Sequence, residues 1–179
     1  FLYVATRFDG LWIFSLASNG KVSEINRLLR PREFTESVKI LDDRMFLTHH
    51  VDGIEVLDLS DPSQPATLAT LTEGFVDAWG IAPEADGSIW VAVHERFVEL
   101  LPDGSQGRRT PALAQPLGSP IACPEGFICI SGDDVVRINT STTAAAVLLD
   151  PQDTSPRALL LDDSGALWVT TYGGGLYRR

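Results

Sequence analysis

Short runs of apolar and β-branched residues, separated by turn residues, follow one another along the whole chain, and no long window carries a helical period. Five segments share one arrangement, in which a β-rich strand leads through a turn into a second strand. They are LYVATRFDGLWIF from Leu2, MFLTHHVDGIEVL from Met45, IWVAVHERFVEL from Ile89, FICISGDDVVRI from Phe127 and LWVTTYGGGLYRR from Leu167. The second residues of these segments, Tyr3, Phe46, Trp90, Ile128 and Trp168, are 43, 44, 38 and 40 residues apart, so the chain repeats one unit.

Each complete unit predicts four strands, named A to D in chain order. Strand A ends in a tight turn, strand B leads to a turn that is often centred on glycine, and strands C and D follow, with D the weakest pattern. The turns after strand A include Asp86-Gly87, Glu125-Gly126 and Ser164-Gly165, and the glycines after strand B are Gly10, Gly53 and Gly175.

A repeat of this length made of four antiparallel strands is typical of a propeller blade. The predicted fold is therefore all-β, a β-propeller of about five four-stranded antiparallel blades in a single domain over residues 1–179. The blade units are expected at about 1–36, 37–72, 73–114, 115–152 and 153–179.

The two end units are incomplete in different ways. The first begins at strand B and the last ends at strand C, so the two remainders do not complete one blade. We therefore expect the chain to be part of a larger ring. The alternative is a closed ring of five blades, two of them three-stranded.

Composition narrows the choice of partners. The 179 residues are 44% hydrophobic and 21% charged, as in soluble globular proteins, and the formal net charge is -10. This acidity argues against binding to nucleic acid or to anionic membrane surfaces. No apolar run is long enough for a membrane helix, so we expect no direct membrane insertion.

Several units resemble known propeller repeats. The last unit resembles the two-component regulator propeller repeat through Asp162, Asp163, Gly165, Leu167, Trp168, Val169, Thr171, Gly174, Gly175, Leu176 and Tyr177. The second unit resembles an LVIVD-type repeat through Gly53, Ile54, Val56, Asp58, Ser60, Asp61, Pro62 and Pro65. The third unit, from Ala78 to Ser105, is similar to repeats of streptogramin-lyase-like and lactonase-like propellers.

These resemblances imply different functions. Regulator propellers are extracytoplasmic sensing domains, LVIVD proteins are mostly surface or secreted, and lyase-like and lactonase-like rings are metal-dependent enzymes. We expect a periplasmic or extracellular, sensor-type scaffold that binds a small molecule or a protein on its loop face, without catalysis and without a cofactor. The alternatives are a metal-dependent propeller enzyme and a purely structural repeat domain.

Candidate binding residues follow the B strands. Arg7, His50, His94, Gly132 and Tyr172 come at the start of the turns between strands B and C, and these turns share one propeller face with the loops between strands D and A. Of these, we name Arg7, His50, His94 and Tyr172 as candidate ligand-binding residues, suited to an anionic or sugar-like ligand. The alternative is that they are unrelated solvated strand ends.

The neighbouring D–A loops carry mixed charges that suggest a solvated rim or a partner surface. These are Arg30, Arg32, Glu33, Glu36, Glu73, Asp77, Asp153 and Arg157. The aromatic Phe34 lies in the first of these loops and is expected to pack on a neighbouring blade or to plug the channel mouth.

We expect no metal site. His49 and His50 are adjacent in a strand and therefore point to opposite faces, so they cannot bind one ion without a bulge. Acidic residues near the A–B turns are expected to form turns: Asp42, Asp43, Glu84, Asp86, Glu125, Asp162 and Asp163.

The two cysteines, Cys123 and Cys129, flank the A–B turn of the fourth unit. A turn centred on Gly126 would place them opposite each other, within reach of a disulfide, and a turn centred on Glu125 would leave two thiols.

Overall fold

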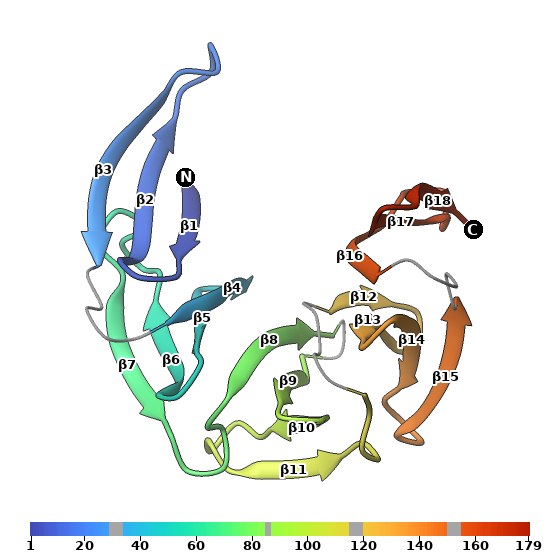
Figure 1. Cartoon of the computed structure of the whole chain (residues 1–179). Coiled ribbons are helices and arrows are strands. Elements are labelled where there is room, and N and C mark those ends of the chain that lie inside the picture. Colours follow the sequence, from blue (N-terminus) through green and yellow to red (C-terminus); the bar gives the residue numbers. More distant parts are fainter. Residues whose placement is uncertain (29–33, 85–86, 115–119, 150–154) are drawn as a thin grey trace. The chain divides into compact units, whose positions relative to one another are not determined.

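The computed structural model describes residues 1–28, 34–84, 87–114, 120–149 and 155–179, and in these ranges every regular element is a β-strand (Figure 1). The strands are β1 (Leu2–Thr6), β2 (Gly10–Leu16), β3 (Val22–Leu28), β4 (Thr35–Leu41), β5 (Arg44–His49), β6 (Gly53–Asp58), β7 (Ala66–Leu71), β8 (Ala78–Pro83) and β9 (Ile89–Val93). They continue with β10 (Arg96–Leu100), β11 (Gln106–Arg109), β12 (Ile121–Cys123), β13 (Gly126–Ser131), β14 (Asp134–Asn139), β15 (Ala144–Leu149), β16 (Ser155–Leu161), β17 (Leu167–Tyr172) and β18 (Gly175–Arg178).

These strands form five sheets, the blades of a β-propeller, which confirms the predicted fold class. Three sheets have four strands, in the orders β4-β5-β6-β7, β8-β9-β10-β11 and β12-β13-β14-β15. The first and last sheets have three, β1-β2-β3 and β16-β17-β18. The predicted order of strands A to D within each unit is confirmed, including a first unit that begins at strand B and a last unit that ends at strand C.

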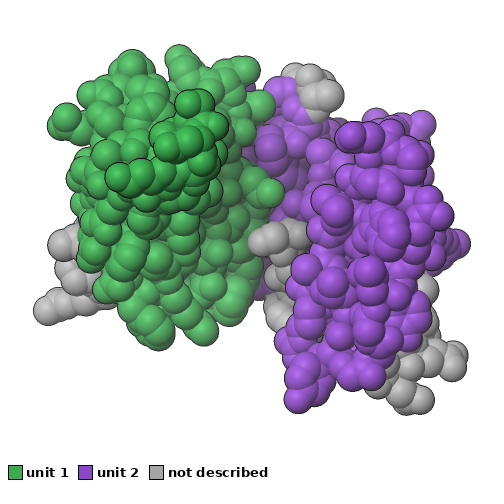
Figure 2. All heavy atoms as spheres, turned by 90° about the horizontal axis from the view of Figure 1, so that it is seen from above, with its two compact units in different colours: residues 1–81 green, residues 82–179 purple. Residues whose placement is uncertain are grey.

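The chain divides into two compact units, residues 1–81 and residues 82–179 (Figure 2). Strand β8 runs across this division. Each unit is described by itself below, and a single domain over residues 1–179 stays a prediction. None of the described residues belongs to a helix long and apolar enough to cross a membrane.

The strand register explains how the first two sheets pack. Leu2 and Val4 lie opposite Phe14 and Trp12, so these four side chains share one face of the first sheet. Tyr3, by contrast, lies opposite Ile13 and shares the other face. This second face packs against the second sheet in a core of Leu11, Ile13, Met45, Leu47 and Leu57, with Tyr3, Leu28, Val38 and Leu59 around it.

The same rule applies at the other end of the chain. Leu167 and Val169 of β17 pack on Ile128 and Val135 of the fourth sheet. Trp168, between them in sequence, lies opposite Leu160 and therefore belongs to the other face. In both packed pairs, strand B of the later sheet turns the first and third residues of its repeat segment toward the preceding sheet, namely Met45 and Leu47 or Leu167 and Val169. Strand B of the preceding sheet contributes the second residue of its segment, Tyr3 or Ile128.

One glycine is required by close approach. Gly53 starts β6 after the β5–β6 turn with a φ of 88°, in the left-handed region that side chains rarely adopt. A Cβ at this position would collide with the carbonyl oxygen of Leu71 on β7. The glycine therefore lets the turn and the outer strand meet.

The register leads to a matched pair of stability predictions. Leu47 and Val4 occupy equivalent positions in their repeats, but Leu47 is 0% exposed and Val4 is 36% exposed. We expect Leu47→Ala to lower the free energy of unfolding by about 2–5 kcal/mol, because it opens a cavity in a packed core. Val4→Ala should change it by less than about 0.5 kcal/mol. Urea unfolding of both variants measures the difference, and equal losses would contradict the assignment of the two faces.

Candidate functional site

The structure confirms where the candidate residues stand along their strands. Arg7, His50, His94 and Gly132 each directly follow strand B of a repeat, and Tyr172 is the last residue of β17, the B strand of the last repeat. Arg7 and His50 belong to the unit of residues 1–81, and the other three belong to the unit of residues 82–179.

Phe34 connects Arg7 and His50 in the first unit. The Arg7 guanidinium carbon lies 5.6 Å from the centre of the Phe34 ring, and the His50 ring lies 6.3 Å from it, edge to face. On the β1–β2 turn, Phe8 also meets Phe34 edge to face at 5.5 Å. The backbone N–H of His50 donates to the Phe34 carbonyl at 3.0 Å. Phe34 therefore packs on neighbouring turns, as one of its two predicted roles requires.

His50 also contacts the first strand of the third sheet. Its ring lies 4.5 Å from that of Trp79 on β8, and its Nε2 lies 3.3 Å from Asp77 Oδ1. Asp77 has a φ of 60°, a left-handed conformation that aspartate tolerates better than most residues. The side chains of His50 and Asp77 are both partly exposed, at 29% and 28%.

A β-bulge places the carboxylate that pairs with Arg7. Between β4 and β5, Thr35 lies opposite His49 and Ser37 lies opposite Thr48, so Glu36 is the extra residue of the bulge. Glu36 Oε1 lies 3.2 Å from Arg7 Nε, with the glutamate side chain 18% exposed and the arginine side chain 58% exposed. The positive charge of Arg7 is thus already paired.

A buried polar chain lies within the second sheet, next in sequence to Phe34 and His50. Thr35 Oγ1 is 3.2 Å from His49 Nδ1, and His49 Nε2 is 3.4 Å from Glu55 Oε2. Glu55 Oε1 accepts a hydrogen bond of 2.6 Å from Thr67 on β7. The order hydroxyl, imidazole, carboxylate is that of a nucleophilic triad. Thr35 is only 2% exposed and His49 only 1%, so the chain holds the four strands together and offers no accessible nucleophile.

His49 and His50 therefore face different surroundings, as strand alternation predicts. His49 is buried between Thr35 and Glu55, whereas His50 lies at the surface beside Asp77.

In the unit of residues 82–179, His94 and Tyr172 are both exposed. His94 is exposed and has a φ of 52° at the start of the β9–β10 turn. Tyr172 is 76% exposed, and the guanidinium of Arg157 lies 5.6 Å from its ring centre. Arg157 is the extra residue of a bulge between Pro156 and Ala158 on β16. As with Glu36, the extra residue of a bulge places a charged side chain beside the end of the neighbouring B strand.

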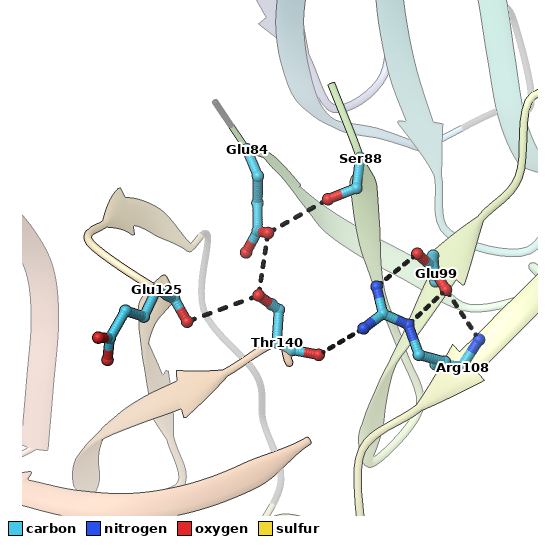
Figure 3. A network of polar contacts seen from close by, with 6 residues as sticks. All are labelled: Glu84, Ser88, Glu99, Arg108, Glu125 and Thr140. Carbon is cyan, nitrogen blue, oxygen red and sulfur yellow. Dashed lines mark hydrogen bonds and ion pairs between the residues drawn. The ribbon is translucent and has the colours of Figure 1, made fainter. Parts of the chain in front are cut away.

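The acidic residues Glu84 and Glu125 join two sheets of the second unit (Figure 3). Glu84 Oε2 accepts hydrogen bonds from Thr140 Oγ1 at 2.9 Å and from Ser88 Oγ at 3.2 Å. The carbonyl of Glu125 accepts from the backbone N–H of Thr140 at 3.2 Å. These contacts connect the ends of β8 and β14.

Arg108 completes this joint. It binds both carboxylate oxygens of Glu99, at 2.9 and 2.7 Å, and donates from Nη1 to the carbonyl of Thr140 at 2.8 Å (Figure 3). A bidentate pair that also reaches a backbone carbonyl fixes the third sheet against the fourth.

Asp162 forms a turn, as predicted. Asp162 Oδ1 accepts from the N–H and Oγ of Ser164 and from the N–H of Ala166, while Oδ2 accepts from the indole of Trp168. The hydrogen bond from the Ser164 hydroxyl, followed by that from Trp168, holds the pKa of Asp162 well below its usual range. Asp61 and Asp103 bind Ser63 and Ser105 in the same way, and these serines lower their pKa values. Asp86 lies outside the described residues.

Within the described ranges, no three His, Cys, Asp or Glu side chains are grouped closely enough to hold a metal ion. The loop residues Arg30, Arg32, Glu33 and Asp153 also lie outside these ranges.

Both cysteines are free thiols. Cys123 lies opposite Gly126, and Cys129 lies opposite Val136, so the turn spans Pro124 and Glu125 and keeps the sulfurs apart. This is the second of the two predicted arrangements. Burial raises the pKa of the Cys129 thiol to about 12.

The sequence analysis did not name Trp79 and Phe8 as members of this site, and it named Glu36 only among the charges of a solvated rim or partner surface. Trp79 is the second residue of an apolar strand, where an aromatic side chain normally indicates core packing. Phe8 immediately follows Arg7, and its place in a turn was the available signal. Glu36 reaches Arg7 only because of a bulge, which the sequence pattern does not mark.

No protein-family model matches the chain, and no curated protein matches it. Solved structures share its fold. The extracellular domain of a hybrid two-component system from B. thetaiotaomicron has a TM-score of 0.74 and 14% identity, over 99% of this chain and 27% of that one. An inactive virginiamycin B lyase from Staphylococcus aureus has a TM-score of 0.67 and 16% identity, over 94% of this chain and 62% of that one. A structure of the nidogen/laminin complex gives a TM-score of 0.71 and 15% identity, over 94% of this chain and 68% of that one. The chain thus spans about a quarter of the first of these proteins and under two thirds of the second, and the likeness shows the fold alone.

The joint around Arg108 leads to a stability prediction. Arg108→Ala should lower the free energy of unfolding by roughly 1–2 kcal/mol, because it removes a charge-assisted pair whose carboxylate, on Glu99, is 12% exposed. The control is Arg96→Ala, since Arg96 pairs with the adjacent Glu95, a residue 51% exposed. Chemical denaturation should show little change for the control. An equal effect of the two substitutions would contradict the role of Arg108 between the sheets.

Proposed function

We propose that the chain is a recognition module of an extracytoplasmic sensor-type propeller, without catalysis of its own. Its ligand or partner binds the aromatic turn surface, defined as Arg7, Phe8, Phe34, His50, Asp77 and Trp79. The observation that carries this proposal is the unbroken run of ring contacts from Phe8 on the β1–β2 turn through Phe34 and His50 to Trp79 on β8, which links the first three sheets.

Exposure and rigidity both support this assignment. Phe8 is 69% exposed, and the aliphatic Val51 and Val76 in the adjoining turns are 46% and 39% exposed. Phe34, His50 and Trp79 are partly exposed. Aromatic side chains that are accessible at loops above a packed scaffold are typical of binding surfaces. The buried Thr35–His49–Glu55 chain fixes the strands from which Phe34 and His50 extend. Little conformational entropy then remains to be lost when a ligand binds.

The extracellular placement rests on analogy. The two-component system domain with the same fold is extracellular, and the resemblance of the last unit to regulator propeller repeats supports the same setting for this chain. His94 and Tyr172 lie at equivalent strand ends in the separate compact unit of residues 82–179 and are not part of the proposed surface.

The proposal is tested by nuclear magnetic resonance with a panel of oligosaccharides, amino acids and short peptides. We expect compounds that bind to shift the amides of residues 7–9, 50–52 and 76–79 first. Phe8→Ala should weaken their binding by about fivefold, because it removes one exposed aromatic contact.

Leu68→Ala is the matched control, since Leu68 is an exposed side chain, 56% exposed, on the outer strand β7 of the same unit. Binding that shifts other residues instead, or that Phe8→Ala and Leu68→Ala change alike, would rule out this surface.

A further inference from the structure

We propose that the aromatic turn surface binds a basic segment of a partner protein, with an arginine or lysine side chain of that segment placed over the Trp79 ring beside the Asp77 carboxylate. This inference rests on the proposed function and names its partner class. It differs from the anionic or sugar-like ligand that the sequence alone suggested for Arg7 and His50.

Charge is the first reason. The described turns and loops that build this edge, at residues 7–9, 34–36, 50–52 and 72–77, contain five acidic residues and one arginine. The whole chain carries a formal net charge of -10. A surface with this balance attracts cations over distances of about a Debye length and repels anions.

The pairing of Arg7 is the second reason. Its guanidinium lies 3.2 Å from Glu36 Oε1, so the positive charge that would hold an anionic ligand is already compensated. Binding an anion there would require breaking this pair. The second candidate residue, His50, likewise faces a carboxylate, that of Asp77 at 3.3 Å.

The third reason is that the protein itself already shows the chemistry. Arg7 places a guanidinium 5.6 Å from the Phe34 ring centre and beside the Glu36 carboxylate. Aromatic faces attract cations through their quadrupole, and a nearby carboxylate adds to the attraction. Trp79 and Asp77, both in contact with His50, repeat the combination of a ring and a carboxylate at the start of the third sheet.

The surroundings suit the stem of a basic side chain as well as its charge. Val51 and Val76 expose apolar surface in the turns beside His50 and Asp77. Arginine and lysine carry methylene stems that pack on such surface while the charged end reaches a carboxylate. A segment of a protein chain offers several of these side chains at once, which a single small cation does not.

The experiment uses the whole chain and three peptides of sequence Ac-GSXGSXGSXGS-NH2, in which X is arginine, its neutral isostere citrulline, or glutamate. Binding is followed through the indole N–H signal of Trp79, assigned with Trp79→Phe. We expect the arginine peptide to bind at least about fivefold more tightly than the citrulline peptide. Binding of the arginine peptide should also weaken as the salt concentration is raised.

Charge-neutral variants test the contacts. Glu36→Gln and Asp77→Asn should each weaken binding of the arginine peptide by about two- to fivefold. Asparagine also tolerates the left-handed backbone of position 77. The control is Asp163→Asn, which removes the same charge from an exposed turn of the second unit and should leave binding unchanged. Circular dichroism and melting curves confirm that each variant is folded.

Three results would overturn the inference, and they separate it from the proposed function. If the glutamate peptide binds more tightly than the arginine peptide and shifts the Trp79 signal, the proposed surface is supported, but its partner is acidic and the inference is wrong. Equal weakening by Asp163→Asn would show binding to net charge alone. If none of the peptides and no compound of the broader panel shifts Trp79 or residues 7–9, both the inference and the proposed function fail.

Discussion

The face-to-face packing of neighbouring sheets within each compact unit is the constraint on which the rest of this structure depends. Strand β13 is buried at all six positions, and β5 and β6 are buried at five of six, so these central strands contact apolar side chains on both faces. One sheet cannot supply this environment by itself, and stacking along the chain does. Because the central strands are fixed in this way, their ends are fixed too, and the turns after β1 and β5 can hold Arg7 and His50 around Phe34.

The architecture could be predicted because the sequence repeats one pattern of strands and turns. Each strand needs a residue pattern and a turn, and the spacing of the turns is visible in glycines such as Gly53 and Gly175, both at positive φ. The two-residue turn at Pro124 and Glu125 was left open, since a shift of one residue changes the partner of every side chain and the sequence does not fix that register. Whether Cys123 and Cys129 lie opposite each other, within reach of a disulfide, depended on this shift.

The candidate site could be predicted only in part, for a related reason. Strand order alone places Arg7 and His50 at the same edge, and the structure shows both on Phe34. Glu36 reaches Arg7 through a bulge, which arises from how β4 meets β5 and leaves no mark in the hydrophobic pattern. This bulge also reverses the chemical interpretation of the site, because it neutralises the arginine that suggested an anionic ligand. The resulting combination of rings and carboxylates is instead suited to a cation.

Native-state hydrogen exchange of backbone amides tests the central constraint most directly. If stacking on both faces stabilises the central strands, amides of β5 and β13 should exchange slowest, and only through global unfolding. Amides of the outer strands β3 and β7, whose side chains are largely exposed, should exchange through smaller openings at lower free energy. Exchange of β5 as fast as that of β3 and β7 would contradict the account, because the turns above β5 would then lack the rigid support that the proposed binding surface requires.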